Sequence, residues 1–356
     1  YKEIAAATTA TGRERLVIAQ KYAEDKNNYP QILNDGRTIY LENKVVYGDT
    51  DSIFIRFQTL DKDGNSLTGR DSRIKSIELA QFTEREIQKT KLRHPQVLEY
   101  GKTFDPFILL SKKRYVGDLY EVDPDKYKLK SMGIVLKRRD NAPIVKIIYG
   151  GIIDIIMKQK SILPAIDFLR RTLRDLVKGK YGLDTLVLSK TLSSYYKDPD
   201  RIAHKVLADR MAERDPGNKP QVNDRIPFVY VTTEHLKQQT NLLQGDKIEN
   251  PDYIIKNKLT PDYEFYITNQ IMKPVSQIFG LCLKDLPGFP KTRISEFDNI
   301  YKKQLSSGKT INESIKKMLD AKNKEAGKIL FRDILRILEN KRMKNTEITS
   351  FFNVRK

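Results

Sequence analysis

The sequence is poor in cysteine and has no long apolar segment, and both absences narrow the classes of protein to consider. Cys282 is the only cysteine among 356 residues, which excludes a disulfide framework within the chain and any zinc or iron–sulfur site that needs several thiolates. No apolar run reaches the roughly 20 residues that a membrane-spanning helix requires, and no secretory leader pattern is present. We therefore expect a soluble, intracellular protein from a reducing compartment.

Acidic residues are fewer than basic ones. The chain has 46 Asp and Glu against 65 Lys and Arg, a net charge of +19. Such an excess favours polyanionic partners, because neutralising phosphates releases condensed counterions. A hydrophobic content of 39% is sufficient for a buried core and for two or three domains, which excludes a disordered polycation. Composition therefore supports a nucleic-acid partner, although a generic basic surface has the same composition.

Two aspartates stand on a short turn between two apolar segments. Residues 45–55 read VVYGDTDSIFI, and this pattern predicts a β-hairpin with Asp49 and Asp51 at its tip. Two carboxylates at this separation repel each other, and a divalent cation shared with a phosphate-bearing substrate would explain why both stay ionised. The alternative is an ordinary Asp-rich hairpin turn, which has the same triplet.

The six residues from Tyr47 to Ser52 resemble the third polymerase motif of the family B DNA polymerases at every position. In that family a Lys-Lys-Arg-Tyr element follows and holds the primer-template duplex. This chain has the same four residues, Lys112, Lys113, Arg114 and Tyr115, after the strand-like segment 107–110. A basic tetrad alone is more often a solvated loop, but here both motifs occur in the family's order. The resemblance covers roughly residues 1–290 and is nearest to polymerases of large double-stranded DNA viruses.

The resemblance implies roles for these residues. A primer 3′-hydroxyl would attack a deoxynucleoside triphosphate in a two-metal phosphoryl transfer that releases pyrophosphate. Asp49 and Asp51 are the implied catalytic residues: Asp51 is the principal ligand of Mg²⁺, with two ions per complete site, and Asp49 is a weaker or outer-sphere ligand. Lys113 and Tyr115 are implied contacts to the nascent duplex, with Lys112 and Arg114 nearer to phosphates or structural acids.

Several motifs of the same family are missing from the chain. Neither the fingers motif that contacts the incoming nucleotide nor the upstream motif that supplies the other metal-binding aspartate is present, and no exonuclease motif occurs. The chain also begins at Tyr1 in what reads as the middle of a domain. We therefore expect a fragment that needs an upstream polymerase segment to complete its active site and that is inactive alone.

Later segments resemble the end of the palm and the thumb of the family. In residues 132–140, Arg138 and Arg139 are either phosphate contacts or ion-pair partners of Asp140. The segment from Asp224 to Tyr230 matches a thumb segment that grips product duplex, and Arg225 is its implied DNA contact. A lone His204 is interpreted as structural or as a phosphate contact, and the aromatic residues of 262–267 as core.

The C-terminal region is basic and helical, with fifteen Lys or Arg against six Asp or Glu between residues 301 and 356. Its helices are expected to have apolar faces that run through Ile315, Met318 and Leu319 and then through Ile329, Leu330, Ile334, Ile337 and Leu338. We expect these helices to cap the thumb and to add an electrostatic contribution to DNA binding. Its last residues have the spacing of a sliding-clamp-binding peptide, in which an aliphatic residue and two aromatics share one face of a short helical turn. The implied clamp contacts are Asn345, in place of the usual Gln, and Ile348, Phe351 and Phe352. The alternative is an apolar cluster that folds back on the helices.

These observations predict an α+β fold. An antiparallel palm sheet with the motif hairpin is expected over residues 1–145, a mainly helical thumb over 146–295 and the basic helical tail over 296–356. Within the first region, the residue pattern predicts helices around residues 8–22 and 74–91 and short strands around residues 97–100, 107–110 and 115–120. The predicted function is that of a fragment of a replicative DNA polymerase, acting on primer-template DNA and deoxynucleoside triphosphates at the nucleus or at a cytoplasmic viral replication site. Two alternatives remain, a natural split subunit and a non-catalytic DNA-binding or clamp-binding module derived from a polymerase.

Overall fold

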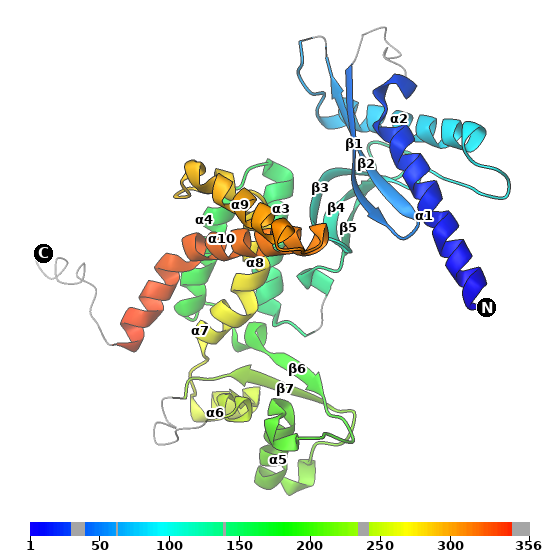
Figure 1. The fold of residues 1–356 in the computed structure, drawn as a ribbon. Helices are drawn as coiled ribbons and strands as arrows, with labels where there is room; N and C mark the ends of the chain where they lie inside the picture. Colours follow the sequence, from blue (N-terminus) through cyan, green and yellow to red (C-terminus); the bar gives the residue numbers. More distant parts are fainter. Residues whose placement is uncertain (30–39, 62, 138–139, 234–241, 344–356) are drawn as a thin grey trace, which may run out of the picture. The chain divides into compact units, whose positions relative to one another are not determined.

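The computed structural model describes residues 1–29, 40–61, 63–137, 140–233 and 242–343. The chain divides into two compact units, residues 1–134 and 135–356. Antiparallel sheets in both units and a mainly helical C-terminal region confirm the predicted α+β class (Figure 1). The boundaries proposed for palm, thumb and tail stay predictions.

The first unit contains the predicted motif hairpin. Strand β1 (Tyr40–Asp49) pairs with β2 (Ser52–Leu60) in antiparallel register, with Asp49 opposite Ser52 at the turn. A bulge between Val45 and Tyr47 interrupts the alternation of side chains. Val46, the residue at the bulge, is 40% exposed, whereas the following Tyr47 is 8% exposed.

Two helices of the first unit pack against this hairpin. They are α1 (Lys2–Glu24) and α2 (Gly69–Thr90), and both agree with the helical periodicity of the sequence. Tyr29 lies at the centre of the small core beside the hairpin, and its hydroxyl is 2.9 Å from the Thr83 hydroxyl of α2. The other members of this core are Leu41 and Leu79, with Tyr22, Phe57 and Phe82 around them.

A second sheet follows in the same unit. It has the order β3 (Thr103–Ser111), β4 (Arg114–Tyr120) and β5 (Tyr127–Met132), all antiparallel. The strand expected over residues 97–100 is absent, so that prediction is wrong. The physical reason lies in α2, whose Gln88 and Glu84 side chains accept hydrogen bonds from backbone amides of this segment.

The second unit begins with two helices that pack on each other. Helix α3 (Pro143–Gln159) ends where Lys160 adopts a left-handed conformation with φ of 50°, and α4 (Leu163–Val177) follows at once. Apolar side chains at helical spacing give each helix a buried face. Fully buried side chains on α3 include Ile144, Ile148, Tyr149 and Ile152.

A small sheet and short helices come next in the sequence. The strands are β6 (Leu188–Thr191), β7 (Arg225–Tyr230) and β8 (Ile248–Glu249), in the order β6-β7-β8. Helices α5 (Ala203–Arg214) and α6 (Pro251–Asn257) contact β7. The buried Glu249 accepts two hydrogen bonds of 3.0 Å from Arg214, which ties α5 to this sheet.

The remaining helices complete the second unit. Helix α7 (Tyr263–Phe265) continues through a π-helical turn (Tyr266–Ile271) into α8 (Met272–Leu281). Among the aromatic residues interpreted as core, Tyr266 is fully buried, whereas Tyr263 and Phe265 are only half-buried. The Tyr266 hydroxyl donates to the Leu186 carbonyl and accepts from the Tyr230 amide.

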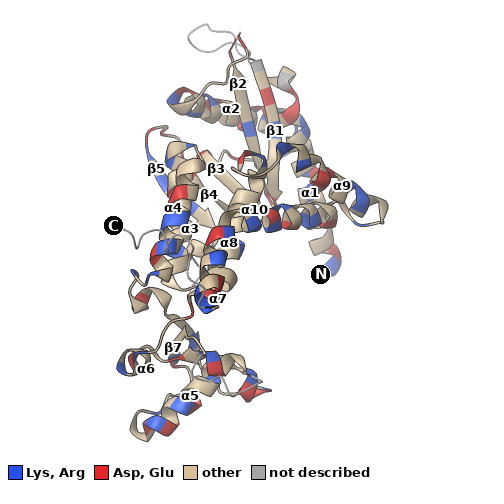
Figure 2. Cartoon of the chain, turned by 90° about the vertical axis from the view of Figure 1, so that its left-hand side faces the viewer, with Lys and Arg blue, Asp and Glu red and all other residues tan. Residues whose placement is uncertain are grey.

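The basic C-terminal region forms α9 (Ile294–Ser306) and α10 (Ile311–Arg342). Helix α10 packs against α8, α9 and α4, with Leu330 and Phe331 buried. Ile315, expected on the apolar face, is 38% exposed, because the buried face turns away from it in the first turns of the helix. Figure 2 shows Lys and Arg interspersed with Asp and Glu along α10. None of the helices in the described residues is long and apolar enough to cross a membrane.

Candidate functional site

The turn between β1 and β2 places the two predicted aspartates next to each other. Thr50 adopts a left-handed conformation with φ of 55°, and the Asp51 amide donates to the Asp49 carbonyl at 2.6 Å. The Ser52 hydroxyl donates to the same carbonyl at 3.1 Å. The turn thus leaves the carboxylate of Asp49 partly exposed and Asp51 exposed.

A second hairpin tip of the same unit reaches this turn. Lys112 and Lys113 form the turn between β3 and β4, and Lys113 has a φ of 59°. The Lys113 amide donates to the Tyr47 hydroxyl at 2.8 Å, and the Lys113 ammonium lies 2.9 Å from Asp49 Oδ1. The fold therefore joins the Asp-Thr-Asp motif to the Lys-Lys-Arg-Tyr motif.

This ion pair sets the electrostatics of the site. The hydrogen bond from Lys113 lowers the pKa of Asp49, with smaller contributions from the lysine charge and from the Thr50 and Tyr47 hydroxyls. The same hydrogen bond raises the pKa of Lys113. Both groups therefore stay charged at neutral pH, and Asp49 has one oxygen engaged by lysine.

Aromatic rings hold the two hairpins together, a contact that the sequence analysis missed. Phe54 of β2 lies 5.6 Å from Phe107 and from Tyr115, measured between ring centroids. Tyr47 and Phe104 complete the cluster. Tyr115, expected at the DNA, is only 7% exposed, so in the structure its ring packs between the strands. The many aromatic residues in these strands indicated that rings could pack together, but the sequence does not specify which rings are in contact.

Gly133 supports the lysine turn from the end of β5. Its φ is 61°, and a Cβ at this position would collide with the Lys113 carbonyl oxygen. The Gly133 carbonyl also accepts a hydrogen bond of 3.3 Å from Arg114 Nε. A residue without a side chain is therefore required here for the β3–β4 turn to keep its conformation.

The other predicted site residues lie elsewhere or outside the described residues. Arg225, at the start of β7 in the second unit, donates from its guanidinium to the Ser189 hydroxyl at 2.6 Å and is exposed. His204 pairs with the Tyr196 hydroxyl at 3.0 Å, and burial lowers its pKa, which fits a structural role. Arg138 lies outside the described residues, as do the clamp residues Asn345, Ile348, Phe351 and Phe352.

The chemistry of the aspartate turn fits a hard divalent cation in part. Carboxylate oxygens are the ligands that Mg²⁺ prefers, and Asp49 and Asp51 provide them. Among the residues that the structure describes, no group of three His, Cys, Asp or Glu side chains is arranged to hold a metal ion. The two aspartates therefore supply only some of the oxygen ligands that a Mg²⁺ site would need.

Both hairpin motifs lie in a region that matches a known protein family. A sequence model described as DNA polymerase family B matches residues 1–282, which include both hairpin motifs. The chain belongs to DNA polymerase family B. Within this family-B chain, residues 283–356, including α9 and α10, lie beyond the matched region.

Viral proteins are among the relatives of this family-B chain. A DNA polymerase of Pyramimonas orientalis virus is 50% identical over 353 residues, 99% of the chain and 28% of the relative. A DNA polymerase of Acanthamoeba polyphaga mimivirus is 51% identical over 249 residues, 69% of the chain and 14% of the relative. The chain therefore spans less than a third of the length of these relatives.

A solved structure shares the fold of the family-B chain. The family B DNA polymerase of the archaeon Pyrobaculum calidifontis superposes with a TM-score of 0.51 at 20% identity, over 78% of this chain and 30% of that one. At this identity the likeness supports the fold alone.

Proposed function

We propose that the chain is part of a replicative DNA-directed DNA polymerase and contributes one half of its metal site and its grip on primer-template DNA. The observation that supports this most strongly is the meeting of the two hairpin tips, where Lys113 contacts Asp49 beside the exposed Asp51. If the Asp-Thr-Asp segment were only a hairpin turn, it would not need the basic β3–β4 turn beside it.

In this proposal the aspartates hold two Mg²⁺ ions together with the substrate. Asp51 is the principal ligand, because its carboxylate is exposed and accepts no hydrogen bond from the described residues. Asp49 is the weaker ligand, because Lys113 engages one of its oxygens. When bound, the ions lower the pKa of the primer 3′-hydroxyl and neutralise the triphosphate.

The basic residues then position the nucleic acid. Lys112 and Lys113 stand exposed on the β3–β4 turn and would contact backbone phosphates or the primer end, as would Arg138 and Arg225. Tyr115 would act mainly by packing, because its ring is buried between the strands. Such contacts are independent of base sequence, as a polymerase that copies any template requires.

The site is incomplete within the described residues, and we propose that an upstream polymerase segment completes it. We therefore expect residues 1–356 alone to bind primer-template DNA in a salt-dependent manner and not to extend it. Fluorescence anisotropy over a range of salt concentrations measures the first, and a primer-extension gel the second. Extension by this chain alone would contradict the proposal that the metal site is shared.

The decisive experiment is primer extension by the longer gene product that contains this chain. Asp51→Asn should lower the rate by at least about a hundredfold, because it removes the charge of the principal metal ligand, and Asp49→Asn should lower it less. Asp63→Asn, an exposed aspartate on another turn of the same unit, is the matched control and should leave extension unchanged.

Other results of the primer-extension experiment would support different conclusions. Extension that persists in Asp51→Asn would mean that the aspartate turn is not the metal site. If the longer product binds primer-template but never extends it, a split polymerase that needs a second polypeptide is tested by adding candidate subunits. Failure of every such addition would leave a non-catalytic DNA-binding module.

Two further parts of the proposal concern partners and place. The segment with Ile348, Phe351 and Phe352 would dock on a sliding clamp and keep the polymerase on its template. The protein would act where DNA is replicated, at the nucleus or at a cytoplasmic viral replication site.

A further inference from the structure

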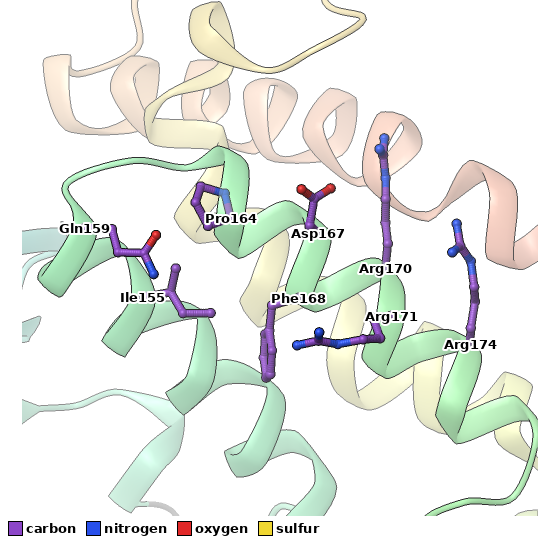
Figure 3. Close-up of a pocket in the computed structure, with 8 residues that line it drawn as sticks. All are labelled: Ile155, Gln159, Pro164, Asp167, Phe168, Arg170, Arg171 and Arg174. Atoms are coloured by element: carbon purple, nitrogen blue, oxygen red, sulfur yellow. The ribbon is translucent and has the colours of Figure 1, made fainter.

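A basic hollow lies between α3 and α4 in the second unit, far in sequence from both hairpin motifs. It has a volume of about 550 Å³, which is within the range of sites that bind a small ligand or a peptide side chain. Its walls combine the apolar Ile155, Pro164 and Phe168 with the cationic Arg170, Arg171 and Arg174, and one carboxylate, Asp167, also lines it (Figure 3). This site is called the α3–α4 hollow below.

The apolar side of the hollow follows from the packing of the two helices. Gly151 lies one turn before Ile155 on α3, and a Cβ at Gly151 would collide with the Phe168 ring of α4. The missing side chain lets the ring lie against α3. Ile155 and Phe168 remain half-buried rather than covered, so an apolar surface is open to a ligand.

The cationic side chains of the hollow come from α4. Arg174 lies three and four positions after Arg171 and Arg170, spacings that make it a neighbour of each on the helix surface. Arg171 points toward Phe168, whereas Arg170 and Arg174 point together to another side of α4 (Figure 3). Like charges four residues apart destabilise an isolated helix, so this arrangement is unfavourable unless an anion offsets it.

Carboxylates lie near these arginines, since Asp167 shares the hollow and Asp333 of α10 lines a smaller hollow with Arg170 and Arg174, but no ion pair joins them within the part of the chain that is described. Asp167 is three and four residues before Arg170 and Arg171, a spacing that allows ion pairs, yet it pairs with neither. Asp175, whose pKa Arg171 helps to lower, is engaged by Lys180 at 2.8 Å. The three guanidinium groups therefore have no ion-pair partner among the described residues.

We propose that the α3–α4 hollow binds an acidic peptide segment of a partner protein, one that carries an apolar side chain between carboxylates. The apolar side chain would lie against Ile155 and Phe168. The flanking carboxylates would accept paired hydrogen bonds from the arginines, whose planar guanidinium matches a carboxylate. This proposal does not depend on polymerase activity.

The composition of the walls favours a peptide over a nucleic-acid strand. Proteins bind phosphate backbones mainly through charge, which needs no hollow. The basic helices of this chain already provide such charge on their surface. A hollow with an aliphatic and an aromatic wall adds selectivity only for a ligand with an apolar group to bury. An acidic peptide with an apolar side chain can contact the apolar residues and the arginines of the hollow at the same time.

The test measures peptide binding by fluorescence anisotropy at physiological ionic strength, with the 356-residue chain. The probe is a labelled peptide of about a dozen residues in which a Leu-Phe pair stands between Asp and Glu runs. We expect saturable binding, weakened about tenfold by Arg171→Ala and by about a hundredfold in Arg171→Glu/Arg174→Glu. Arg201→Ala removes an exposed arginine elsewhere in the same unit and is the matched control.

Two comparisons decide between a peptide site and a general polyanion site. A second peptide with Ser in place of Leu and Phe should bind at least about tenfold more weakly, and a short single-stranded DNA should not displace the first peptide at equal concentration. Equal binding of both peptides, displacement by DNA, or loss of binding in Arg201→Ala would overturn the proposal. Circular dichroism of each variant establishes that the helices are intact, and Arg171→Lys keeps the charge while it removes the planar fork.

Discussion

The ammonium group of Lys113 lies 2.9 Å from the Asp49 carboxylate, although the two residues come from different hairpins. The Lys113 amide at the same time donates to the hydroxyl of Tyr47, two residues before Asp49. A single lysine thus contacts the aspartate motif through both its backbone and its side chain. Any change in the β3–β4 turn should therefore alter the surroundings of the Asp49 carboxylate.

Removing the lysine should change the titration of Asp49. Lys113→Met deletes the hydrogen bond that contributes most to the lowered pKa, so the pKa of Asp49 should rise toward its ordinary value. Carboxyl carbon chemical shifts, followed by NMR over pH, measure this directly. Lys112→Met, on the same turn but without this contact, should leave the pKa of Asp49 where it is.

The same pair predicts a pH dependence of stability. Because folding lowers the pKa of Asp49, its contribution is present above the unfolded pKa of about 4 and is lost as the pH falls through the lower folded pKa. The stability difference between the wild type and Lys113→Met should therefore shrink as the pH falls below about 4. A difference that stays constant across this range would exclude the ion pair as its cause.

Gly133→Ala should destabilise the first unit by about 3 kcal/mol, because it adds a collision with the Lys113 carbonyl to the cost of a left-handed alanine. Gly64→Ala is the control, since Gly64 also has a positive φ, of 80°, but no neighbour near its missing Cβ. That change should cost only about 1 kcal/mol. Chemical denaturation of both variants gives the difference, and equal losses would argue against the collision.

Tyr266→Phe should destabilise the second unit by about 2 kcal/mol. The hydroxyl is fully buried and serves two backbone groups, donating to Leu186 at 2.7 Å and accepting from the Tyr230 amide at 3.1 Å. Its removal leaves both groups unsatisfied. Tyr195→Phe, at a side chain that is 79% exposed, should change stability by no more than about 0.5 kcal/mol. Thermal unfolding followed by circular dichroism compares the two.

The clamp segment makes a prediction that rests on sequence alone. Changing Phe351 and Phe352 together to Ala should weaken binding to a sliding clamp by about 2–4 kcal/mol, because two aromatic anchors of the peptide are lost. Surface plasmon resonance with immobilised clamp measures the effect, and the neighbouring Asn353→Ala is the control. Unchanged affinity in the double variant would remove the clamp from the proposal.

The local sequence pattern was sufficient to predict much of the secondary structure of the first unit. The apolar and turn residues of 45–55 predicted the β1–β2 hairpin, and helical periodicity predicted α2. These predictions succeed because strand alternation and helix spacing are properties of neighbouring residues. The wrong strand over residues 97–100 shows the limit, since side chains of α2 took the hydrogen bonds that a strand would have used.

The candidate site could likewise be predicted only in part from the sequence. Its residue types could be read from the two motifs, but the contact between them could not, because the Lys113–Asp49 pair and the burial of Tyr115 depend on which strands pack together. The requirement for Gly133 is of the same kind, since only the folded turn brings the Lys113 carbonyl against it.

By itself, the sequence determined the charge, the two motifs, the membership of a fold class and the candidate metal ligands, because each of these is a property of residues close together in the chain. Only the tertiary structure decided that the two hairpin tips meet, that a ring cluster joins them, and that three arginines of α4 share a hollow with Phe168. Those relationships arise from packing between distant segments, which local spacing does not specify.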